Sequence, residues 1–386
     1  MVKNRGRCKS FLIFERDFEA CKLRTMQMAF PPGFPGLHRS PAKRRRDEDT
    51  ESEDLRCGRY RPAGLDASVS SVPLPSLGCI RALAVGSDGT VFVCTDSALY
   101  GLSAAGEVSL IAGARSETGL RDGDGAEARF NKPCGIAVYV DGSLLVVDTF
   151  NHCLRRVSPN GTVSTFAGGC VGGFVDGVGT GARFRYPWNI AVDAQGTIFV
   201  SDHGNHSIRR VTPADGKVTT LCGSREGHSG VTDGDSFVAR FKEPSGLALD
   251  MAGHLIVADC GNSSIRRVRT MDGCVTTVAG SQAGGDAGEG FADGFGVNAR
   301  FRYPFAVAVD QSNSIIVADG HNHRLRVIAS ESGMVTTLAG CSEKGNVDGA
   351  SANARFNIPW LLAMDERQRL LVAELGNQRC VRIVSS

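Results

Sequence analysis

The stretch SDHGNHSIRRV, residues 201–211, poses the question on which the fold assignment depends. Asp202, His203 and His206 place one carboxylate and two imidazoles within five residues, and these side chains are common metal ligands. A metal site would be a singular feature of the chain, whereas a structural turn would recur wherever the fold repeats itself. The remainder of the sequence therefore decides between the two interpretations.

The second half of this stretch recurs along the chain. The full copies are DTFNHCLRRV from Asp148, DHGNHSIRRV from Asp202, DCGNSSIRRV from Asp259, DGHNHRLRVI from Asp319 and ELGNQRCVRI from Glu374. A degenerate copy, DSALYGLS, begins at Asp96. An A-R-F-x-x-P segment precedes each full copy, and a segment such as VTTLAG closes most of them. The chain thus contains six copies of one module, one of them weak.

The spacing of these markers is regular within a copy and variable between copies. From the Arg of A-R-F to the closing Gly the distance is 39 residues once and 40 residues three times. From a closing Gly to the Arg of the next A-R-F it varies from 15 to 20 residues. A period of this size is typical of solenoids and propellers.

The apolar pattern inside a copy separates these two architectures. In residues 182–223 the runs NIAVD, TIFVSD, SIRRVT and KVTTLCG are short, rich in β-branched residues and bounded by turn residues. They are too short for helices and predict four strands. Four antiparallel strands repeated six times predict an all-β fold, a six-bladed β-propeller.

The module also resembles the NHL repeat. P-x-G-I-A-V-D, V-V-D-x-x-N-H-x-L-R-R-V and V-x-T-x-A-G follow one another in it, and Asn151, His152 and Leu154 carry a close variant of the Asn-His-Leu signature. The resemblance covers roughly residues 73–384 and implies a six-bladed propeller. We predict a propeller over residues 62–386 after a disordered basic and acidic tail over residues 1–61. Because the last copy lacks an outermost strand, residues 67–73 are expected to supply it and close the ring.

The repetition favours a structural role for the polar residues of the opening stretch. Asp and Asn of each D-x-x-N segment are expected to form the turn between the second and third strands. His206 shares its position in the repeat with His152 and His323, whereas the repeat does not require His203 or His321. Consecutive arginines alternate along a strand, so we expect them to point to opposite faces and to pair with Asp side chains between packed blades.

One position of the repeat suggests a binding surface. The residue after the Pro that opens each first strand is Cys134, Trp188, Ser245, Phe305 and Trp360 in successive copies. These side chains should surround the mouth of the central channel, on the face that carries the connectors and the D-x-x-N turns. The candidate binding residues are Trp188, Phe305, Trp360, Tyr186, Tyr303, His203 and His321, an aromatic patch suited to a peptide. The alternative is that bulky side chains merely plug the channel.

Charge is unevenly distributed. Residues 1–61 carry a net charge of +6 and residues 62–386 a net charge of −4. Within the tail, Lys43, Arg44, Arg45 and Arg46 form a possible nuclear-import patch, with a solvated linker as the alternative. We find no signal peptide and no apolar run long enough to span a bilayer. The 13 cysteines form no C-x-x-C pair, which favours buried thiols in a reducing compartment and predicts a cytoplasmic or nuclear location.

Three classes of function remain open at this stage. We expect first a non-catalytic scaffold that binds a protein or peptide, with no small-molecule cofactor, no metal and no membrane partner. Binding of RNA is the first alternative, implied by some NHL relatives, although a net charge of −4 on the repeats disfavours it. The second alternative is a metal-dependent propeller enzyme of the lactonase or lyase type, for which His203 and His321 would be the ligands to test.

Overall fold

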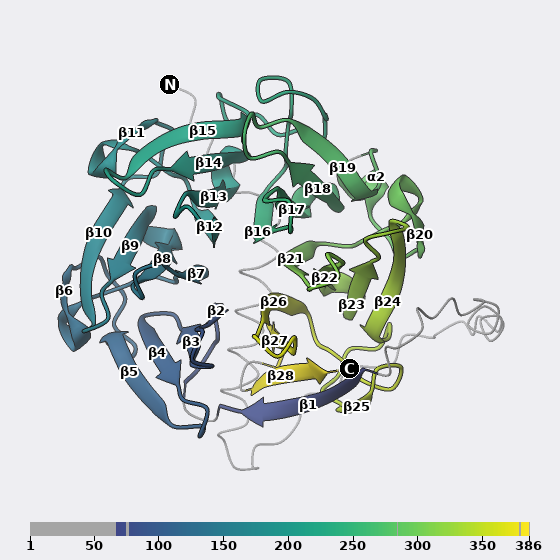
Figure 1. The fold of residues 1–386 in the computed structure, drawn as a ribbon, viewed down its shortest axis with the longest axis horizontal. Helices are drawn as coiled ribbons and strands as arrows, with labels where there is room; N and C mark the ends of the chain where they lie inside the picture. Colours follow the sequence, from purple (N-terminus) through teal and green to yellow (C-terminus); the bar gives the residue numbers. More distant parts are fainter. Residues whose placement is uncertain (1–66, 75–76, 284, 378–379, 386) are drawn as a thin grey trace, which may run out of the picture.

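The computed structural model describes residues 67–74, 77–283, 285–377 and 380–385, which form six antiparallel β-sheets around a central axis (Figure 1). In each sheet, called a blade here, the strands follow one another from the axis outward. The predicted six-bladed propeller is confirmed. The predictions for residues 1–61, including the Lys43–Arg46 patch, lie outside the described residues.

Blades 1 to 3 contain the following strands from the axis outward. Blade 1 has β2 (Ala82–Val85), β3 (Val91–Cys94), β4 (Ala98–Leu102) and β5 (Val108–Gly113). Blade 2 has β7 (Gly135–Val138), β8 (Leu144–Asp148), β9 (Cys153–Val157), β10 (Thr162–Gly168) and β6 (Gly123–Asp124). Blade 3 has β12 (Pro187–Val192), β13 (Ile198–Asp202), β14 (Ser207–Val211), β15 (Lys217–Gly223) and β11 (Gly177–Val178).

Blades 4 to 6 repeat the arrangement. Blade 4 has β16 (Pro244–Leu249), β17 (Leu255–Asp259), β18 (Ser264–Val268) and β19 (Val275–Gly280). Blade 5 has β21 (Pro304–Val309), β22 (Ile315–Asp319), β23 (Arg324–Ile328), β24 (Met334–Gly340) and β20 (Gly294–Phe295). Blade 6 has β26 (Pro359–Met364), β27 (Leu370–Glu374), β28 (Cys380–Ser385), β1 (Ser68–Pro73) and β25 (Gly349–Ala350).

The helical elements are short. Four 3₁₀ turns join the second and third strands of blades 2 to 5, namely η2 (Thr149–Asn151), η4 (His203–Asn205), η5 (Cys260–Asn262) and η7 (Gly320–Asn322). The residue that follows each turn has a left-handed backbone, with φ of 56° at His206. The connectors hold η1 (Gly125–Glu127), η3 (Gly179–Gly181), η6 (Gly296–Asn298) and the single-turn α2 (Gly285–Gly288).

The connector that enters each of blades 2 to 6 folds as a hairpin against that blade. In blade 2, Arg121 bridges Arg129 across the hairpin, and the tip strand β6 pairs with β10. Similar pairs join β11 to β15, β20 to β24 and β25 to β1, while blade 4 has a single bridge from Gly234 to Val275. Each hairpin thus fills the space between two neighbouring blades.

A strand from the start of the described chain closes the ring. β1 pairs antiparallel with β28 in register from Ser68 opposite Ser385 to Pro73 opposite Cys380, as predicted for residues 67–73. The Ser71 N–H and hydroxyl donate to the two carboxylate oxygens of Asp348, each at 2.9 Å. The first and last segments of the propeller therefore belong to one sheet (Figure 1).

We expect closure to depend on the apolar side chains of β1. Val69 is 3 % exposed, so Val69→Asp buries an unpaired carboxylate and should lower the free energy of unfolding by about 3 kcal/mol. Ser70 is the exposed neighbour, and Ser70→Asp should change it by less than about 0.5 kcal/mol. Equilibrium urea unfolding measures both, and equal losses in the two variants would contradict a closing role for β1.

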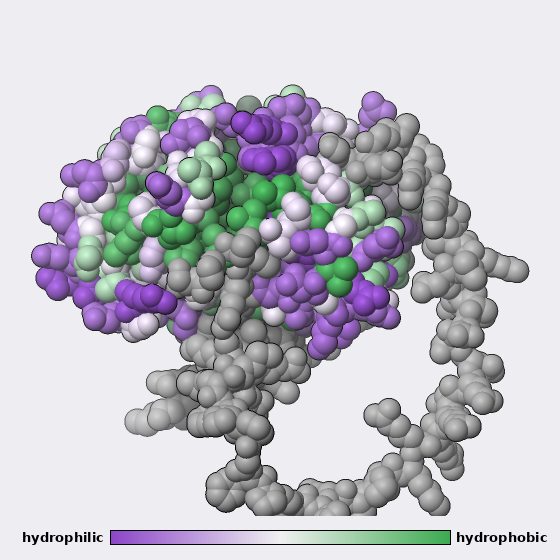
Figure 2. Space-filling view, turned by 90° about the horizontal axis from the view of Figure 1, so that it is seen from below, coloured by the Kyte–Doolittle hydropathy of each residue, from purple (hydrophilic) through white to green (hydrophobic). Residues whose placement is uncertain are grey.

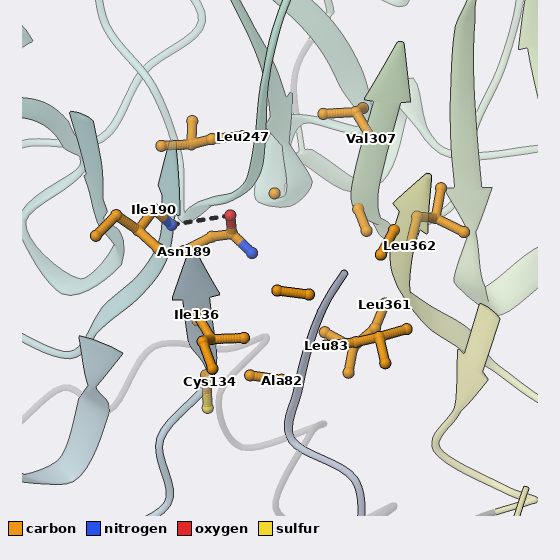
Figure 3. A pocket seen from close by; sticks show the side chains of 15 residues that line it. Ala82, Leu83, Cys134, Ile136, Asn189, Ile190, Leu247, Val307, Leu361 and Leu362 are labelled. Carbon is orange, nitrogen blue, oxygen red and sulfur yellow. Dashed lines mark hydrogen bonds between the residues drawn. The ribbon is translucent and has the colours of Figure 1, made fainter. Parts of the chain in front are cut away.

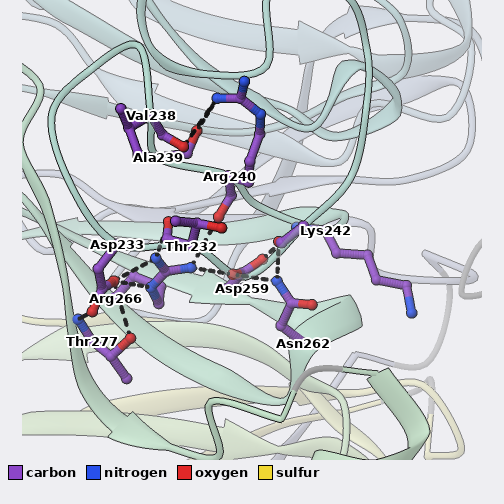
Figure 4. A network of polar contacts seen from close by, with 11 residues as sticks. Thr232, Asp233, Val238, Ala239, Arg240, Lys242, Asp259, Asn262, Arg266 and Thr277 are labelled. Atoms are coloured by element: carbon purple, nitrogen blue, oxygen red, sulfur yellow. Dashed lines mark hydrogen bonds and ion pairs between the residues drawn. The ribbon is translucent and has the colours of Figure 1, made fainter.

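A buried polar network organises each repeated blade, and blade 4 shows it (Figure 4). The Arg266 guanidinium donates to Asp259 at 2.8 Å and to Asp233, in the entering hairpin, at 2.5 Å. Asn262 Nδ2 and the Lys242 N–H also donate to Asp259, both at 2.8 Å. The side chains at positions i+3 and i+7 of the D-x-x-N-x-x-x-R segment therefore converge on the carboxylate at position i.

The network corrects one expectation from the sequence. The arginines pair with Asp as predicted, but inside one blade and its entering hairpin rather than between blades. Ser264 lies opposite Asp259 in the sheet, and Arg266, two residues later, is on the same face of its strand, so strand geometry brings the pair together. The equivalent pairs are Asp148–Arg155, Asp202–Arg209, Asp319–Arg326 and Glu374–Arg382.

Burial sets the electrostatics of this network. It raises the pKa of Asp259 to about 6, against the opposing effects of Arg266, Asn262 and the Lys242 N–H. The carboxyls of the other four pairs shift in the same direction for the same reason. Both side chains of the Asp259–Arg266 pair are 0 % exposed, so either charge alone would be uncompensated.

Two adjacent arginines provide a matched test. Arg266→Met removes a fully buried partner of Asp259 and should lower the free energy of unfolding by about 3–5 kcal/mol. Arg267 lies on the opposite face, is 39 % exposed and pairs at 3.1 Å with Asp250, which is buried but keeps hydrogen bonds from the Ala252 and His254 N–H groups, so Arg267→Met should lower it by only about 1–2 kcal/mol. Urea unfolding compares the variants, and a smaller effect at position 266 than at 267 would refute the organising role.

Candidate functional site

The loop face is the side of the ring that carries the D-x-x-N turns and the residues after each A-R-F. Contacts between them place both on one side, as predicted. The Gly204 N–H donates to the Arg185 carbonyl at 2.9 Å, and the Gly261 N–H donates to the Lys242 carbonyl at 2.9 Å. The Arg185 N–H donates in turn to Asp202 at 2.8 Å. The first strand of each blade therefore starts against the turn of the same blade.

The predicted aromatic residues are mostly packed below this face. Trp360 is 1 % exposed, Trp188 4 % and Phe305 5 %, and they share one apolar cluster with Tyr303. The cluster also contains Leu74, Cys79 and Ile80 from the segment that links β1 to β2. Tyr186 and His321 are half-buried at its edge. The structure thus brings the set together as a packed layer, and its role in binding stays a prediction.

Ring contacts divide this layer into groups. The Trp188 and His203 rings stack at 4.9 Å, and His203 Nδ1 donates to the Pro244 carbonyl of the next blade at 3.2 Å. The Tyr303 and His321 rings lie 4.7 Å apart. His203 and His321 therefore pack against aromatic rings. Among the described residues, no three His, Cys, Asp or Glu side chains are grouped to hold a metal ion.

The cavity at the centre of the ring is lined mostly by apolar side chains (Figure 3). A cavity of about 180 Å³ is lined by the innermost strands of the blades, with side chains such as Leu83, Ile136, Leu247 and Leu361. Asn189 supplies the one amide side chain, and its Oδ1 accepts from the Ile190 N–H at 2.8 Å. Among the lining residues, Asn189 is thus the one with a polar side chain other than the Cys134 thiol.

Sequence reasoning missed a set of cations on the loop face. Arg185, Lys242 and Arg302 follow A-R-F directly in blades 3 to 5, and Lys132 lies one residue later in blade 2. Their backbone N–H groups in blades 3 to 5 are held by the buried Asp carboxylates, and Arg185 and Arg302 are exposed. The stems of Arg185 and Lys242 lie against Gly204 and Gly261. The sequence signal was a basic residue directly after A-R-F, in ARFR (182–185), ARFK (239–242) and ARFR (299–302).

These cations differ in whether a nearby carboxylate forms an ion pair with them. Arg302 lies 3.6 Å from Glu289. Arg185 and Lys242 make no ion pair within the part of the chain that the structure describes. Burial and His203 lower the pKa of His206 to about 4, Glu243 opposes this shift, and Arg185 and Lys242 add to it. Blades 3 and 4 therefore each present one cation on the loop face, next to the buried Glu243.

The histidines of the repeat connect neighbouring blades. His206 Nδ1 accepts from the Glu243 N–H of the next blade at 3.1 Å. His152 accepts in the same way from Tyr186 at 3.1 Å, and His323 accepts from Ile358 at 3.2 Å. Each donor residue has a positive φ, 56° at Glu243, so its N–H points out of the strand direction toward the imidazole. His206 thus makes the structural contact between blades that its place in the repeat suggested.

Comparison with known proteins agrees with this geometry. Residues 184–211, 241–267 and 301–328 match the family model described as NHL repeat. The chain is an NHL-repeat β-propeller protein. Over 295 residues it is 30 % identical to NHL repeat-containing protein 2 of Homo sapiens, covering 68 % of this chain and 40 % of that protein. It is also 30 % identical over 277 residues to Protein SUPPRESSOR OF QUENCHING 1, chloroplastic, of Arabidopsis thaliana, covering 69 % and 26 %.

This NHL chain spans two-fifths or less of these relatives, so it corresponds to one part of them. Among solved structures, a protein of unknown function from Bacteroides thetaiotaomicron matches with a TM-score of 0.62 and 18 % identity, covering 83 % of this chain and 76 % of that one. A streptogramin B lyase matches with a TM-score of 0.53 and 11 % identity, covering 84 % and 99 %. At these identities the matches support the fold alone.

The histidine contacts of this NHL propeller predict a pH-dependent stability difference. His206 has a folded pKa of about 4 against about 6.5 when unfolded, so the unfolded state binds more protons between these values. The contribution of His206 is complete above pH 6.5 and is lost as the pH falls toward 4. The stability advantage of wild type over His206→Ala should therefore shrink by about 2 kcal/mol between pH 7.5 and pH 4.5.

The measured quantity is the difference in the free energy of unfolding between wild type and variant at each pH. The buried carboxyls titrate in both proteins, so their contribution cancels in this difference. Ser263 occupies the equivalent position in blade 4, and Ser263→Ala is the control, because its hydroxyl does not titrate and its difference should not vary with pH. Urea unfolding at five pH values between 4.5 and 7.5 gives both curves. A constant difference for His206→Ala would contradict the assignment.

Proposed function

We propose that this protein is a non-catalytic binding scaffold whose loop face holds an acidic segment of a protein partner. The observation that carries this proposal is the presence of two cations on adjacent blades, Arg185 and Lys242, without ion pairs among the described residues. Two such charges on a rigid frame can receive carboxylates with little ordering of the protein itself. The local charge, rather than the net charge of −4, decides which partner this face attracts.

The rigidity of the frame supports the same proposal. The backbone of Arg185 is fixed by Asp202, and that of Lys242 by Asp259, each through a 2.8 Å hydrogen bond. Their side-chain stems lie against glycines, so a bulkier turn residue would displace them. The two cations are thus presented at a defined spacing, which favours recognition of an extended acidic segment.

The aromatic layer has a supporting part in this proposal. Tyr186 and His321 are half-buried and offer edges to a bound peptide. Trp188, His203, Tyr303, Phe305 and Trp360 lie deeper and act as the packed platform below them. These packed rings fill the mouth of the channel. The proposed contact surface is therefore formed by the cations Arg185 and Lys242 and not by the channel.

RNA is the second candidate, because the same cations beside Tyr186 also suit phosphates and bases. Binding of RNA would depend steeply on salt, through release of counterions. At a fixed ionic strength, the first candidate function therefore predicts tighter binding of an acidic peptide, and the second predicts tighter binding of single-stranded RNA.

A charge-reversal pair tests the proposal. In full-length protein, Arg185→Glu with Lys242→Glu should weaken binding of a glutamate-rich peptide at least tenfold, about 1.4 kcal/mol, measured by fluorescence anisotropy. Arg367 is an exposed arginine in the turn between β26 and β27, away from the loop face, and Arg367→Glu should change the Kd by less than about twofold.

The same titrations distinguish the candidates. Unchanged peptide affinity in the double variant would overturn the acidic-peptide proposal. Single-stranded RNA of equal formal charge serves as the competing probe. Tighter binding of that RNA, lost in the double variant and kept in Arg367→Glu, would favour the second candidate.

A further inference from the structure

Blade 1 exposes an apolar face that every other blade covers. The Val near the start of the outermost strand is 0–3 % exposed in five blades, as Val163, Val218, Val275, Val335 and Val69. Its equivalent in blade 1, Val108, is 44 % exposed. Leu110, two residues further on β5 and on the same face, is 47 % exposed. The difference is confined to the blade whose sequence departs from the repeat.

The missing cover has a simple origin. In blades 2 to 6 an entering hairpin lies against this face, whereas only eight residues, 74–81, separate β1 from β2. The polar network is also absent, because Tyr100 stands where the other blades have the buried Arg, and Leu110 where blade 4 has Thr277. Figure 2, from the side of the ring that carries β1 and β5, shows hydrophobic side chains gathered between hydrophilic margins.

The covered blades show what fits against such a face. In each of them the Phe of A-R-F is at most 1 % exposed and packs between neighbouring blades, as Phe130, Phe184, Phe241, Phe301 and Phe356. The Thr165 N–H of β10 donates to Asp122 of the hairpin at 3.1 Å. Blade 1 has Tyr100 and Leu110 in place of the Arg and Thr that bind the Asp of the hairpin in the other blades. Its occupant therefore needs no acidic side chain and should be aromatic or apolar.

We propose that residues 58–62 of this chain, GRYRP, cover the open face of blade 1. Their order of a small residue, Arg, an aromatic residue, a basic residue and Pro matches ARFRYP, residues 182–187, with one residue fewer before the Pro. Tyr60 would take the place that Phe184 holds between blades 2 and 3. This proposal is independent of the binding function of the loop face.

The distance along the chain permits this contact. Tyr60 precedes Ser68 by eight residues, which span up to about 26 Å when extended. Ser68 begins the outermost strand of blade 6 beside Ala350, whereas the other end of that strand, Pro73, points toward blade 1 (Figure 1), so the segment would run back along β1 to reach the open face. The covalent tether still raises the effective concentration of the segment at that face.

Hydrogen–deuterium exchange of the full chain tests this proposal. The Leu110 amide is equivalent to that of Thr165, which points outward to the hairpin, so its exchange reports whether the face is covered. Tyr60→Asp should accelerate exchange in β5 at least tenfold, and Tyr60→Phe should leave it unchanged. Exchange in β10, residues 162–168, should be the same in all three proteins and shows that the propeller is folded.

Two outcomes would overturn the proposal. Equal exchange of β5 in wild type and Tyr60→Asp, with β10 still protected, would show that Tyr60 does not cover the face. Protection of β5 that disappears on tenfold dilution would show instead that a second copy of the chain covers it.

Discussion

Each repeated blade is built around a carboxylate and a guanidinium from which water is excluded. The pair is stable only when every donor is satisfied, and the spacing D-x-x-N-x-x-x-R provides this from one strand–turn–strand unit. In blade 4, Asp259 accepts from Arg266, Asn262 and the Lys242 backbone, while Arg266 also reaches the Thr232 and Arg240 carbonyls of the hairpin. The network therefore fixes the turn, the hairpin and the start of the first strand relative to one another.

The same constraint determines what the loop face can present. Because the Asp carboxylate holds the backbone N–H of the residue after A-R-F, that residue has a fixed position and a side chain free to vary. Blades 3 to 5 place Arg185, Lys242 and Arg302 there. The histidine contacts add connections between blades, but Ser263 replaces the imidazole in blade 4. Connections between blades thus vary, whereas a buried carboxylate and arginine recur inside each of blades 2 to 6.

Much of this fold could be predicted from the sequence, because repetition multiplies each weak signal. The blade count, the strands, the closing strand and the turn role of Asp and Asn follow from periodicity. The location of the Arg–Asp pairs did not, since the pattern gives the face of a strand but not the path of the hairpin that meets it. Likewise, Trp188 and Trp360 were expected at the mouth, but periodicity cannot tell how deeply a ring packs.

The weak copy shows what the network contributes. In blade 1, Arg81 comes from before the first strand and pairs with Asp96, so an ion pair persists without the Arg in the third strand. Apolar residues then replace the polar partners on the outer strand, and no hairpin lies against this blade within the described part of the chain. A blade without the internal network still forms four strands, because its neighbours and the closed ring support it. Strand formation therefore needs only the apolar pattern, and the network is what attaches a connector to the blade.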